Sequence, residues 1–331
     1  MRFVVVPELV EGNPTMTFGV HMKKIFFSLF AGLVLCAGVC AQSLRLGVLN
    51  GPSCIPAAYL LDESVEKFAD PQALLPKMLK GEIDVGFLPA NVAAKVYNSS
   101  NGAIQCVAIT GNGNLSLITT DAEVKSLADL KGKTVAVAGQ GATPEYMFRY
   151  LLDKNGIAAD TEDGVTLDFS IPTAQIAAQL ISGKISYAVV PEPFATVAQT
   201  KSDKVFVAVD LQAEYERFEG KGKIYPLTVM VVTKAFAKKN AKVLKAFLED
   251  YQASLAKTLE NPMEAGQLTE DFGLGLAAAI VAKSVPKANY VYIPASKSDA
   301  KKQIEELLNI FLAYDQTSIG GKLPDKGFYW K

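Results

Sequence analysis

Residues 134–152, TVAVAGQGATPEYMFRYLL, contain a complete strand–loop–helix unit. The apolar run TVAVAG is rich in β-branched residues and predicts a buried strand. Gly139 and Gly141 allow the following loop to bend freely. Thr143 is placed to cap a helix that carries Pro144 in its first turn. A loop of this kind leaves backbone N–H groups free to hold a polar or anionic ligand.

Two other interpretations of this unit compete with a ligand-binding loop. A dinucleotide site is excluded, because Pro144 stands where the motif G-x-G-x-x-G needs its third glycine. A strand-to-helix turn that binds nothing stays open for one unit alone. The unit recurs, however, in residues 44–61, where the strand LRLGVL precedes Asn50-Gly51-Pro52-Ser53 and a helix that Ser53 is placed to cap.

The rest of the chain alternates short apolar strands with helical segments. The strands include IDVGFLP, CVAIT, LDFSIP, YAVVP and KVFVAVDL. This alternation predicts an α/β fold with largely parallel sheets, flanked by helices, and ligands beyond the carboxyl ends of the strands. With 33 Lys and Arg against 34 Asp and Glu, the charge is balanced and indicates no nucleic-acid partner.

The first 41 residues are typical of a signal peptide. Lys23 and Lys24 precede an apolar run over residues 25–39, which is too short to span a bilayer, and the small residues before Gln42 favour cleavage after Ala41. The true start is then Met22 or Met16, and a lipoprotein anchor is less favoured. Cleavage also removes the only histidine, which argues against imidazole-based catalysis but leaves carboxylate chemistry open.

Two extended crossings, near Gly113 and near Pro226, divide the mature chain. We expect lobe I to comprise residues 42–113 and 229–331, and lobe II residues 114–228. Glycine and asparagine at 111–114 accept many backbone angles, so a hinge with a cleft between the lobes is predicted. Cys54 follows the end of the strand LRLGVLN, whereas Cys106 opens the strand CVAIT. In one parallel sheet these positions lie at opposite edges, so we expect two buried free thiols.

The chain resembles the periplasmic substrate-binding proteins of ABC importers, specifically the nitrate/sulfonate/taurine group with the type II binding-protein fold. The matching segments are GVLNGPSCIPAAYLL, GEIDVGFLPANVAAKVYN, DLKGKTVAVAGQGATPEYMFRYLL, AVVPEPFATVA and SIGGKLPDKGFYW. The resemblance implies a periplasmic two-lobe binding protein that closes on its ligand, has no cofactor or metal, and acts as a monomer with an ABC transporter permease.

The resemblance also implies that the loops after the strands contact the ligand. The residues in those loops are Asn50, Gly51, Pro52, Ser53, Pro89, Ala90, Asn91, Gly141, Ala142, Thr143 and Glu192. For the two asparagines, ordinary turn or cap chemistry is an equal alternative. Glu192, between two prolines, is placed to receive an amino group of a ligand, or else to form an ion pair that fixes its loop.

The ligand itself is left open by the sequence. None of these positions is Lys or Arg, and Glu192 would repel an anion, which favours an uncharged or amine-bearing organic molecule over nitrate. A sulfonate, a nitrate-like anion, and a thiamine-pyrimidine or flavin-like compound all remain candidates. The alternatives to a binding protein are a small-molecule lyase of the menaquinone-pathway type, which shares the fold, and a ligand-sensing domain.

Overall fold

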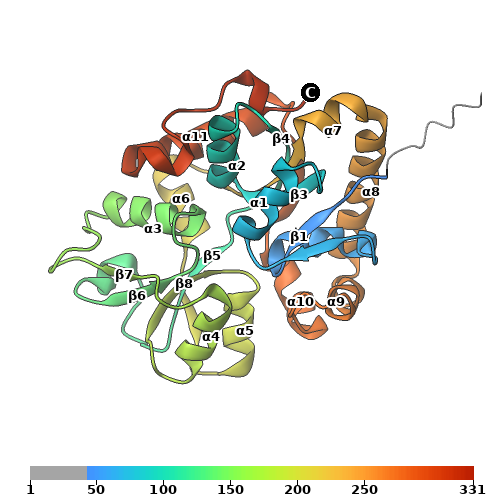
Figure 1. The fold of residues 1–331 in the computed structure, drawn as a ribbon. Helices are drawn as coiled ribbons and strands as arrows, with labels where there is room; N and C mark the ends of the chain where they lie inside the picture. The colour runs from blue at the N-terminus through green and yellow to red at the C-terminus, as the bar shows by residue number, and fades with distance from the viewer. Residues whose placement is uncertain (1–42) are drawn as a thin grey trace, which may run out of the picture. The chain divides into compact units, whose positions relative to one another are not determined.

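The computed structural model describes residues 43–331 (Figure 1). The predicted signal peptide, residues 1–41, lies outside the described residues. Within residues 43–331, no helix combines the length and the apolar character needed to cross a membrane. The described part contains two main β-sheets with helices packed against them, which confirms the α/β class.

The first sheet has four strands in the order β11 (Tyr290–Pro294), β4 (Ile104–Asn112), β10 (Pro226–Thr233) and β3 (Val85–Pro89). A short parallel pair, β1 (Gly47–Leu49) and β2 (Glu66–Phe68), adjoins it through a bridge between Leu46 and Val85. The helical segments in this half are η1 (Pro52–Leu60), α1 (Pro71–Leu79), α2 (Ala90–Ser99), α7 (Lys234–Lys239), α8 (Ala241–Glu260), α9 (Pro262–Asp271), α10 (Ala278–Ser284) and η3 (Val285–Lys287).

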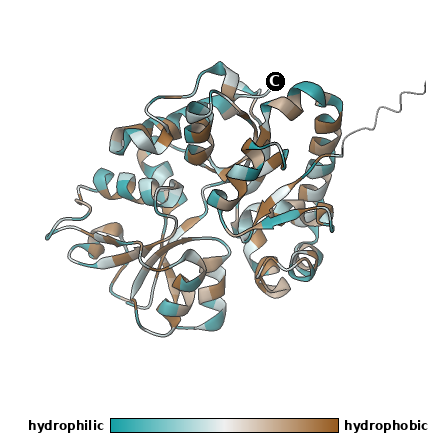
Figure 2. Cartoon of the chain, in the orientation of Figure 1, coloured by the Kyte–Doolittle hydropathy of each residue, from teal (hydrophilic) through white to brown (hydrophobic). Residues whose placement is uncertain are grey.

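The second sheet has five strands in the order β7 (Thr166–Asp168), β6 (Thr134–Val137), β8 (Tyr187–Pro191), β5 (Leu115–Thr119) and β9 (Phe206–Asp210). The helical segments in this half are η2 (Leu127–Leu130), α3 (Thr143–Lys154), α4 (Thr173–Ile181), α5 (Phe194–Lys201) and α6 (Leu211–Glu219). Hydrophobic residues run along the strands of both sheets (Figure 2). Val135, Val189 and Leu117 on three of these strands are wholly buried, as the apolar runs predict.

The expectation of largely parallel sheets is wrong. Among residues 43–331, three strand pairings are parallel and five are antiparallel. The reason lies in where the crossing strands enter. β5 starts beside the end of β8, with Leu115 opposite Pro191, and β10 starts beside the ends of β3 and β4. A strand that enters a sheet at the edge where its neighbours end must run against them.

The two crossings are fastened to each other. The Gly113 N–H donates to the carbonyl oxygen of Tyr225 at 2.9 Å. A Cβ atom on Gly113 would lie 2.4 Å from Cζ of Tyr225, whose side chain is wholly buried. Gly113 does not adopt a positive φ. Gly113 is therefore required at this crossing because it lets the two segments pack closely. From the sequence we expect this glycine to supply freedom of the backbone angles, but Gly113 does not use that freedom in this structure.

The end of the chain contacts both halves. α11 (Ser298–Tyr314) packs against α2 of the first half and α3 of the second, and η4 (Gln316–Ile319) and η5 (Lys326–Phe328) follow it. The rings of Tyr146 on α3 and Phe311 on α11 have centroids 5.1 Å apart. Lys223, before β10, pairs with Glu306 on α11 at 2.9 Å. These contacts join the C-terminal helix to the second half, although β11 belongs to the first sheet.

Candidate functional site

The edge at which the crossing strands enter both sheets also carries the loops that follow β1, β3, β6 and β8. The sequence-predicted site residues lie in these four loops. Two of the loops are in direct contact: Nδ2 of Asn91, in the first turn of α2, donates to the carbonyl oxygen of Gly141 at 2.8 Å. This bond connects the loop after β3 in the first sheet with the loop after β6 in the second.

The loop after β1 is shaped by glycine. Gly51 has a φ of 117°, a conformation that side chains rarely adopt, and occupies the N-cap position of η1. Ser53 therefore lies inside η1 and makes no side-chain cap bond, so its expected capping role is wrong. Asn50 is exposed. The carbonyl oxygen of Pro52 accepts a hydrogen bond from the Tyr290 hydroxyl at 2.9 Å, which ties the loop to β11.

The expected cap by Thr143 is also wrong. α3 begins at Thr143 itself, with Ala142 at the N-cap position and no side-chain cap bond. The Thr143 side chain is wholly buried, and its hydroxyl oxygen has no hydrogen-bond partner among residues 43–331. A buried hydroxyl without a partner is costly, by about 1–3 kcal/mol. The Thr143 hydroxyl is therefore free to bind a ligand atom.

Two further side-chain atoms at this junction are in the same condition. The Oδ1 atom of Asn91 and the Oγ atom of Ser318 are buried and have no partner within the described chain. Ser318 lies beside Asn91, because its carbonyl oxygen is 3.4 Å from Asn91 Nδ2. Pro89 and Ala90 form the remainder of this loop, at the end of β3 and the start of α2. Ser318 was missed from the sequence, since no local pattern distinguishes it.

The N–H groups of the loop after β6 are less open than the sequence suggests. The Gly141 N–H donates to Oε2 of Glu145 at 2.7 Å, and the Ala142 N–H donates to the carbonyl oxygen of Gly139 at 3.1 Å. Arg149 holds Glu145 in place, because Nε of Arg149 donates to Oε1 of Glu145 at 2.9 Å. The carboxylate of Glu145 thus lies at the start of α3, where an anionic ligand would otherwise be favoured.

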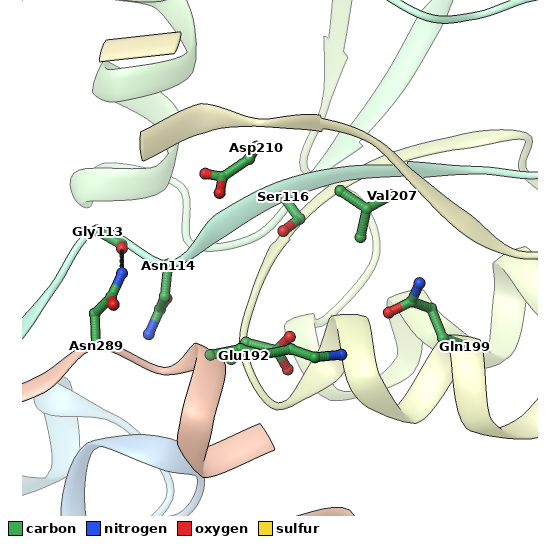
Figure 3. A pocket seen from close by; sticks show the side chains of 9 residues that line it. Gly113, Asn114, Ser116, Glu192, Gln199, Val207, Asp210 and Asn289 are labelled. Atoms are coloured by element: carbon green, nitrogen blue, oxygen red, sulfur yellow. Dashed lines mark hydrogen bonds between the residues drawn. The ribbon is translucent and has the colours of Figure 1, made fainter. Parts of the chain in front are cut away.

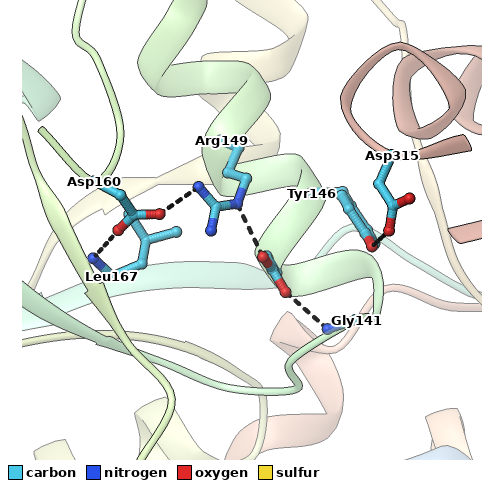
Figure 4. A network of polar contacts seen from close by, with 7 residues as sticks. Gly141, Tyr146, Arg149, Asp160, Leu167 and Asp315 are labelled. Atoms are coloured by element: carbon cyan, nitrogen blue, oxygen red, sulfur yellow. Dashed lines mark hydrogen bonds and ion pairs between the residues drawn. The ribbon is translucent and has the colours of Figure 1, made fainter. Parts of the chain in front are cut away.

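A neighbouring network fixes the first turn of α3 to the C-terminal segment. Arg149 also pairs with Asp160 at 2.7 Å, and Asp160 accepts the N–H of Leu167 at 2.9 Å. On the other side of the helix, the Tyr146 hydroxyl donates to Asp315 at 3.0 Å (Figure 4). The orientation of the loop after β6 is therefore set from both sides.

Glu192 lies apart from the other predicted residues. It follows β8, is only 4% exposed, and accepts the Thr196 N–H at 3.2 Å through Oε2. Burial raises the pKa of its carboxyl group, while the hydrogen bonds with Thr196 and the charge of Lys287 act in the opposite direction. Glu192 forms no ion pair within 4.0 Å among residues 43–331.

Glu192 faces a polar cavity of about 380 Å³ (Figure 3). The cavity is lined by residues of the first crossing, of the loop after β8, of β5, α5 and β9, of η3, and of the segment between η3 and β11. These residues are Gly113, Asn114, Ser116, Glu192, Gln199, Val207, Asp210, Lys287 and Asn289. Of the eleven residues expected from the sequence, Glu192 alone lines this cavity. Asp210 lies at the end of a predicted strand, so the rule that ligands bind beyond the carboxyl ends of strands could have identified it. Lys287 and Asn289 follow no predicted strand, and the sequence gives no signal for them.

A family model described as the NMT1-like family matches residues 55–267. A crystal structure of an ABC transporter from Parabacteroides distasonis is 25% identical, with 87% of this chain and 99% of that chain covered and a TM-score of 0.72. No curated protein sequence matches significantly.

Two further solved structures share the fold at lower identity. The periplasmic aliphatic sulphonate binding protein SsuA from Escherichia coli is 16% identical, with 88% of this chain and 92% of that chain covered and a TM-score of 0.69. The periplasmic nitrate-binding protein NrtA from Synechocystis is 14% identical, with 84% of each chain covered and a TM-score of 0.61.

Proposed function

Because the chain belongs to the NMT1-like family, we propose that it is the extracytoplasmic solute-binding protein of an ABC importer. It binds a small organic molecule and delivers it to the importer's permease, and no bond in the ligand changes. The similar structures include binding proteins and an ABC transporter, which supports this assignment. Residues 42–331 contain no histidine, which further supports binding over imidazole-based catalysis.

The observation that carries the proposal is the junction between Asn91 and Gly141. Three buried side-chain oxygens near this contact have no partner in the described chain. They belong to Asn91 itself, to Thr143 two residues after Gly141, and to Ser318, whose carbonyl oxygen is 3.4 Å from Asn91 Nδ2. Buried polar atoms in proteins are nearly always hydrogen-bonded, and exceptions call for an explanation. A ligand that supplies donors and acceptors at this junction accounts for all three together.

Binding at such a junction closes the protein. We propose that lobe I, residues 42–113 with 229–331, and lobe II, residues 114–228, rotate toward each other about the two crossings. Only a ligand that contacts both loops at once favours the closed form, because a ligand shifts an equilibrium by its difference in affinity for the two states. The Asn91–Gly141 hydrogen bond would form on closure and break on opening.

The contacts favour an uncharged or amine-bearing ligand. Glu145 already occupies the Gly141 N–H, so an anion at the start of α3 would meet a carboxylate. None of the loop residues expected to contact the ligand is a lysine or an arginine. A thiamine-pyrimidine or flavin-like compound therefore fits better than nitrate, and a sulfonate is intermediate because its organic part gains from burial.

The site of action follows from the assignment. We propose that residues 1–41 are removed on export and that the mature chain works in the periplasm as a monomer, with a permease as its partner. The names of the two lower-identity structures, both described as periplasmic, support this location.

The test begins with mass spectrometry of small molecules released from the purified mature protein. The released compound, or in its absence methanesulfonate, nitrate, the pyrimidine of thiamine and riboflavin, is then titrated in thermal melts. Thr143→Val removes the free hydroxyl at nearly constant volume, and we expect at least a tenfold loss of affinity with an unchanged or higher melting temperature without ligand.

The control is Thr134→Val, at the opposite end of β6, which should bind as the wild type does. Small-angle scattering with saturating ligand should show a smaller radius of gyration. The proposal fails if Thr143→Val binds as tightly as the wild type while the radius of gyration stays constant at saturation.

A further inference from the structure

The cavity beside Glu192 is separate from the junction between Asn91 and Gly141. Neither of these residues, nor Thr143, lines the cavity. Its walls come from both halves of the described chain. Asn114, Ser116 and Asp210 belong to the first crossing and the second sheet, while Lys287 and Asn289 precede β11 of the first sheet. Figure 3 shows Asn114, Ser116, Asp210 and Asn289 around one space. The cavity thus has its own set of functional groups.

The side-chain donors of the two asparagines in this cavity are already in use. Nδ2 of Asn114 donates to the carbonyl oxygen of Ala288 at 2.8 Å, and Nδ2 of Asn289 donates to that of Gly113 at 2.5 Å. The backbone N–H of Glu192 donates to the carbonyl oxygen of Asn114 at 3.3 Å. An anion would therefore find no free side-chain donor on either asparagine.

Two acceptor oxygens of the cavity residues, in contrast, have no hydrogen-bond partner within the described residues. Asn114 is 9% exposed, and its Oδ1 atom is buried without a partner among residues 43–331. The bond from Nδ2 to Ala288 fixes which way this amide faces. Asp210 uses Oδ1 to accept the Gln212 N–H at 2.8 Å and the Ala213 N–H at 3.2 Å, and its Oδ2 has no partner in the described part of the chain.

The charges point the same way as the acceptors. Two carboxylates, of Glu192 and Asp210, line the cavity, and Lys287 is the one cationic residue among those described around it. Lys287 forms no ion pair within 4.0 Å in residues 43–331, so it does not neutralise either carboxylate by contact. The local charge is therefore net negative.

We propose that this cavity is a second binding site, for a small polar molecule that carries an ammonium group. The ammonium donates to Oδ1 of Asn114 and to the carboxylates of Glu192 and Asp210, and Ser116 binds a hydroxyl or carbonyl group of the same molecule. A volume of about 380 Å³ is near the lower end for ligand pockets and suits a molecule of amino-alcohol or amino-acid size. The residues that line this site are separate from Asn91 and Thr143.

The experiment uses three probes of nearly equal size on the mature chain: ethanolamine, which carries an ammonium group at neutral pH, the neutral ethylene glycol, and the anion glycolate. Binding is followed by chemical shifts of backbone and side-chain amides in two-dimensional NMR spectra. We expect saturable shifts at Asn114 and Asn289 with ethanolamine and at least tenfold weaker effects with the other two probes, because hydrogen bonds to charged groups are the stronger ones.

Variants identify the groups responsible. Asp210→Asn keeps an oxygen for the start of α6 and removes the charge, and Glu192→Gln does the same after β8. Each should weaken ethanolamine binding by about tenfold, as expected for one charge-assisted hydrogen bond. Lys287→Met should strengthen it by removing a like charge. Asp203→Asn, in the turn before β9, is the charge-matched control and should leave binding unchanged.

The second site is refuted if glycolate or ethylene glycol binds as well as ethanolamine, or if both carboxylate variants bind ethanolamine like the wild type. It is also refuted if the shifts appear only at Asn91 and in residues 139–143. Thr143→Val separates the two proposals, since it should weaken binding at the junction at least tenfold and leave the ethanolamine shifts at Asn114 intact.

Discussion

Gly113→Ala tests how tightly the two crossings are packed. The new Cβ would lie 2.4 Å from Cζ of Tyr225 and 2.5 Å from Oε1 of Gln212. The Tyr225 ring has little room to move, because it is wholly buried and packs against the ring of Tyr215 with centroids 5.2 Å apart. Hydrogen bonds from Asn289 and to Tyr225 also hold the backbone of Gly113 in place.

Overpacking of this kind costs about 1–3 kcal/mol. Replacing glycine by alanine returns about 0.4–1 kcal/mol through the unfolded chain where the backbone conformation is compatible. We therefore expect a net loss of about 1 kcal/mol in the free energy of unfolding, and a melting temperature about 2 °C lower.

Gly111→Ala is the matched control, two residues earlier on β4. Its Cβ would meet Thr228 at 3.7 Å, an ordinary contact, so the stability should stay the same or rise slightly. Urea unfolding of both variants, followed by circular dichroism, measures the difference. Equal midpoints for the two variants would refute the claim that the crossings are closely packed against each other.

Three further predictions concern single groups. Arg45→Met should lower the free energy of unfolding by about 3 kcal/mol, because Arg45 makes a bidentate ion pair with Asp84, which is 2% exposed and would be left buried without its partner. A difference of less than about 1 kcal/mol in urea unfolding at neutral pH would contradict this. Cys54 and Cys106 are wholly buried and burial raises the pKa of both thiols, that of Cys54 to about 12, so iodoacetamide should label them only after unfolding; labelling of the native protein at the rate of a free thiol would show otherwise. Burial raises the pKa of Glu192 above its value in the unfolded chain, so the contribution of Glu192 to stability is full below the unfolded pKa and is lost as the pH rises through the folded pKa. Glu192→Gln should therefore flatten the decline of the urea midpoint above pH 4.5, and an unchanged slope would exclude Glu192 as the source of that decline.

Local patterns predicted the elements of the site well. The strand and helix expected in residues 134–152 appear as β6 and α3, because a run of β-branched residues and a proline in the first helical turn act on their immediate neighbours. Capping was predicted less well. Thr143 and Ser53 have the right chemistry for caps, but glycine and alanine one or two residues earlier take the N-cap positions.

Non-local features could not be derived from the sequence. The antiparallel course of β5 and β10 depends on the edge at which each enters its sheet, and residue patterns within a strand do not encode that edge. The cavity brings Lys287 and Asn289 to Asn114 across more than 170 positions of sequence. The contact of Asn91 with Gly141 likewise joins two loops whose separate sequences indicate only turns.

The order of strands in the first sheet has a consequence for how the chain is made. The second sheet is complete once residues 115–210 have been synthesised, whereas the first sheet has β10 between β3 and β4 and so waits for residues 226–233. Until then β3 and β4 have no partner strand between them, and unpaired strand edges are prone to join other chains. β11 then covers the outer side of β4. β3 and β4 therefore emerge from the ribosome well before the strand that pairs with both of them. A chaperone that shields nascent chains would be needed most while residues 112–226 are being synthesised.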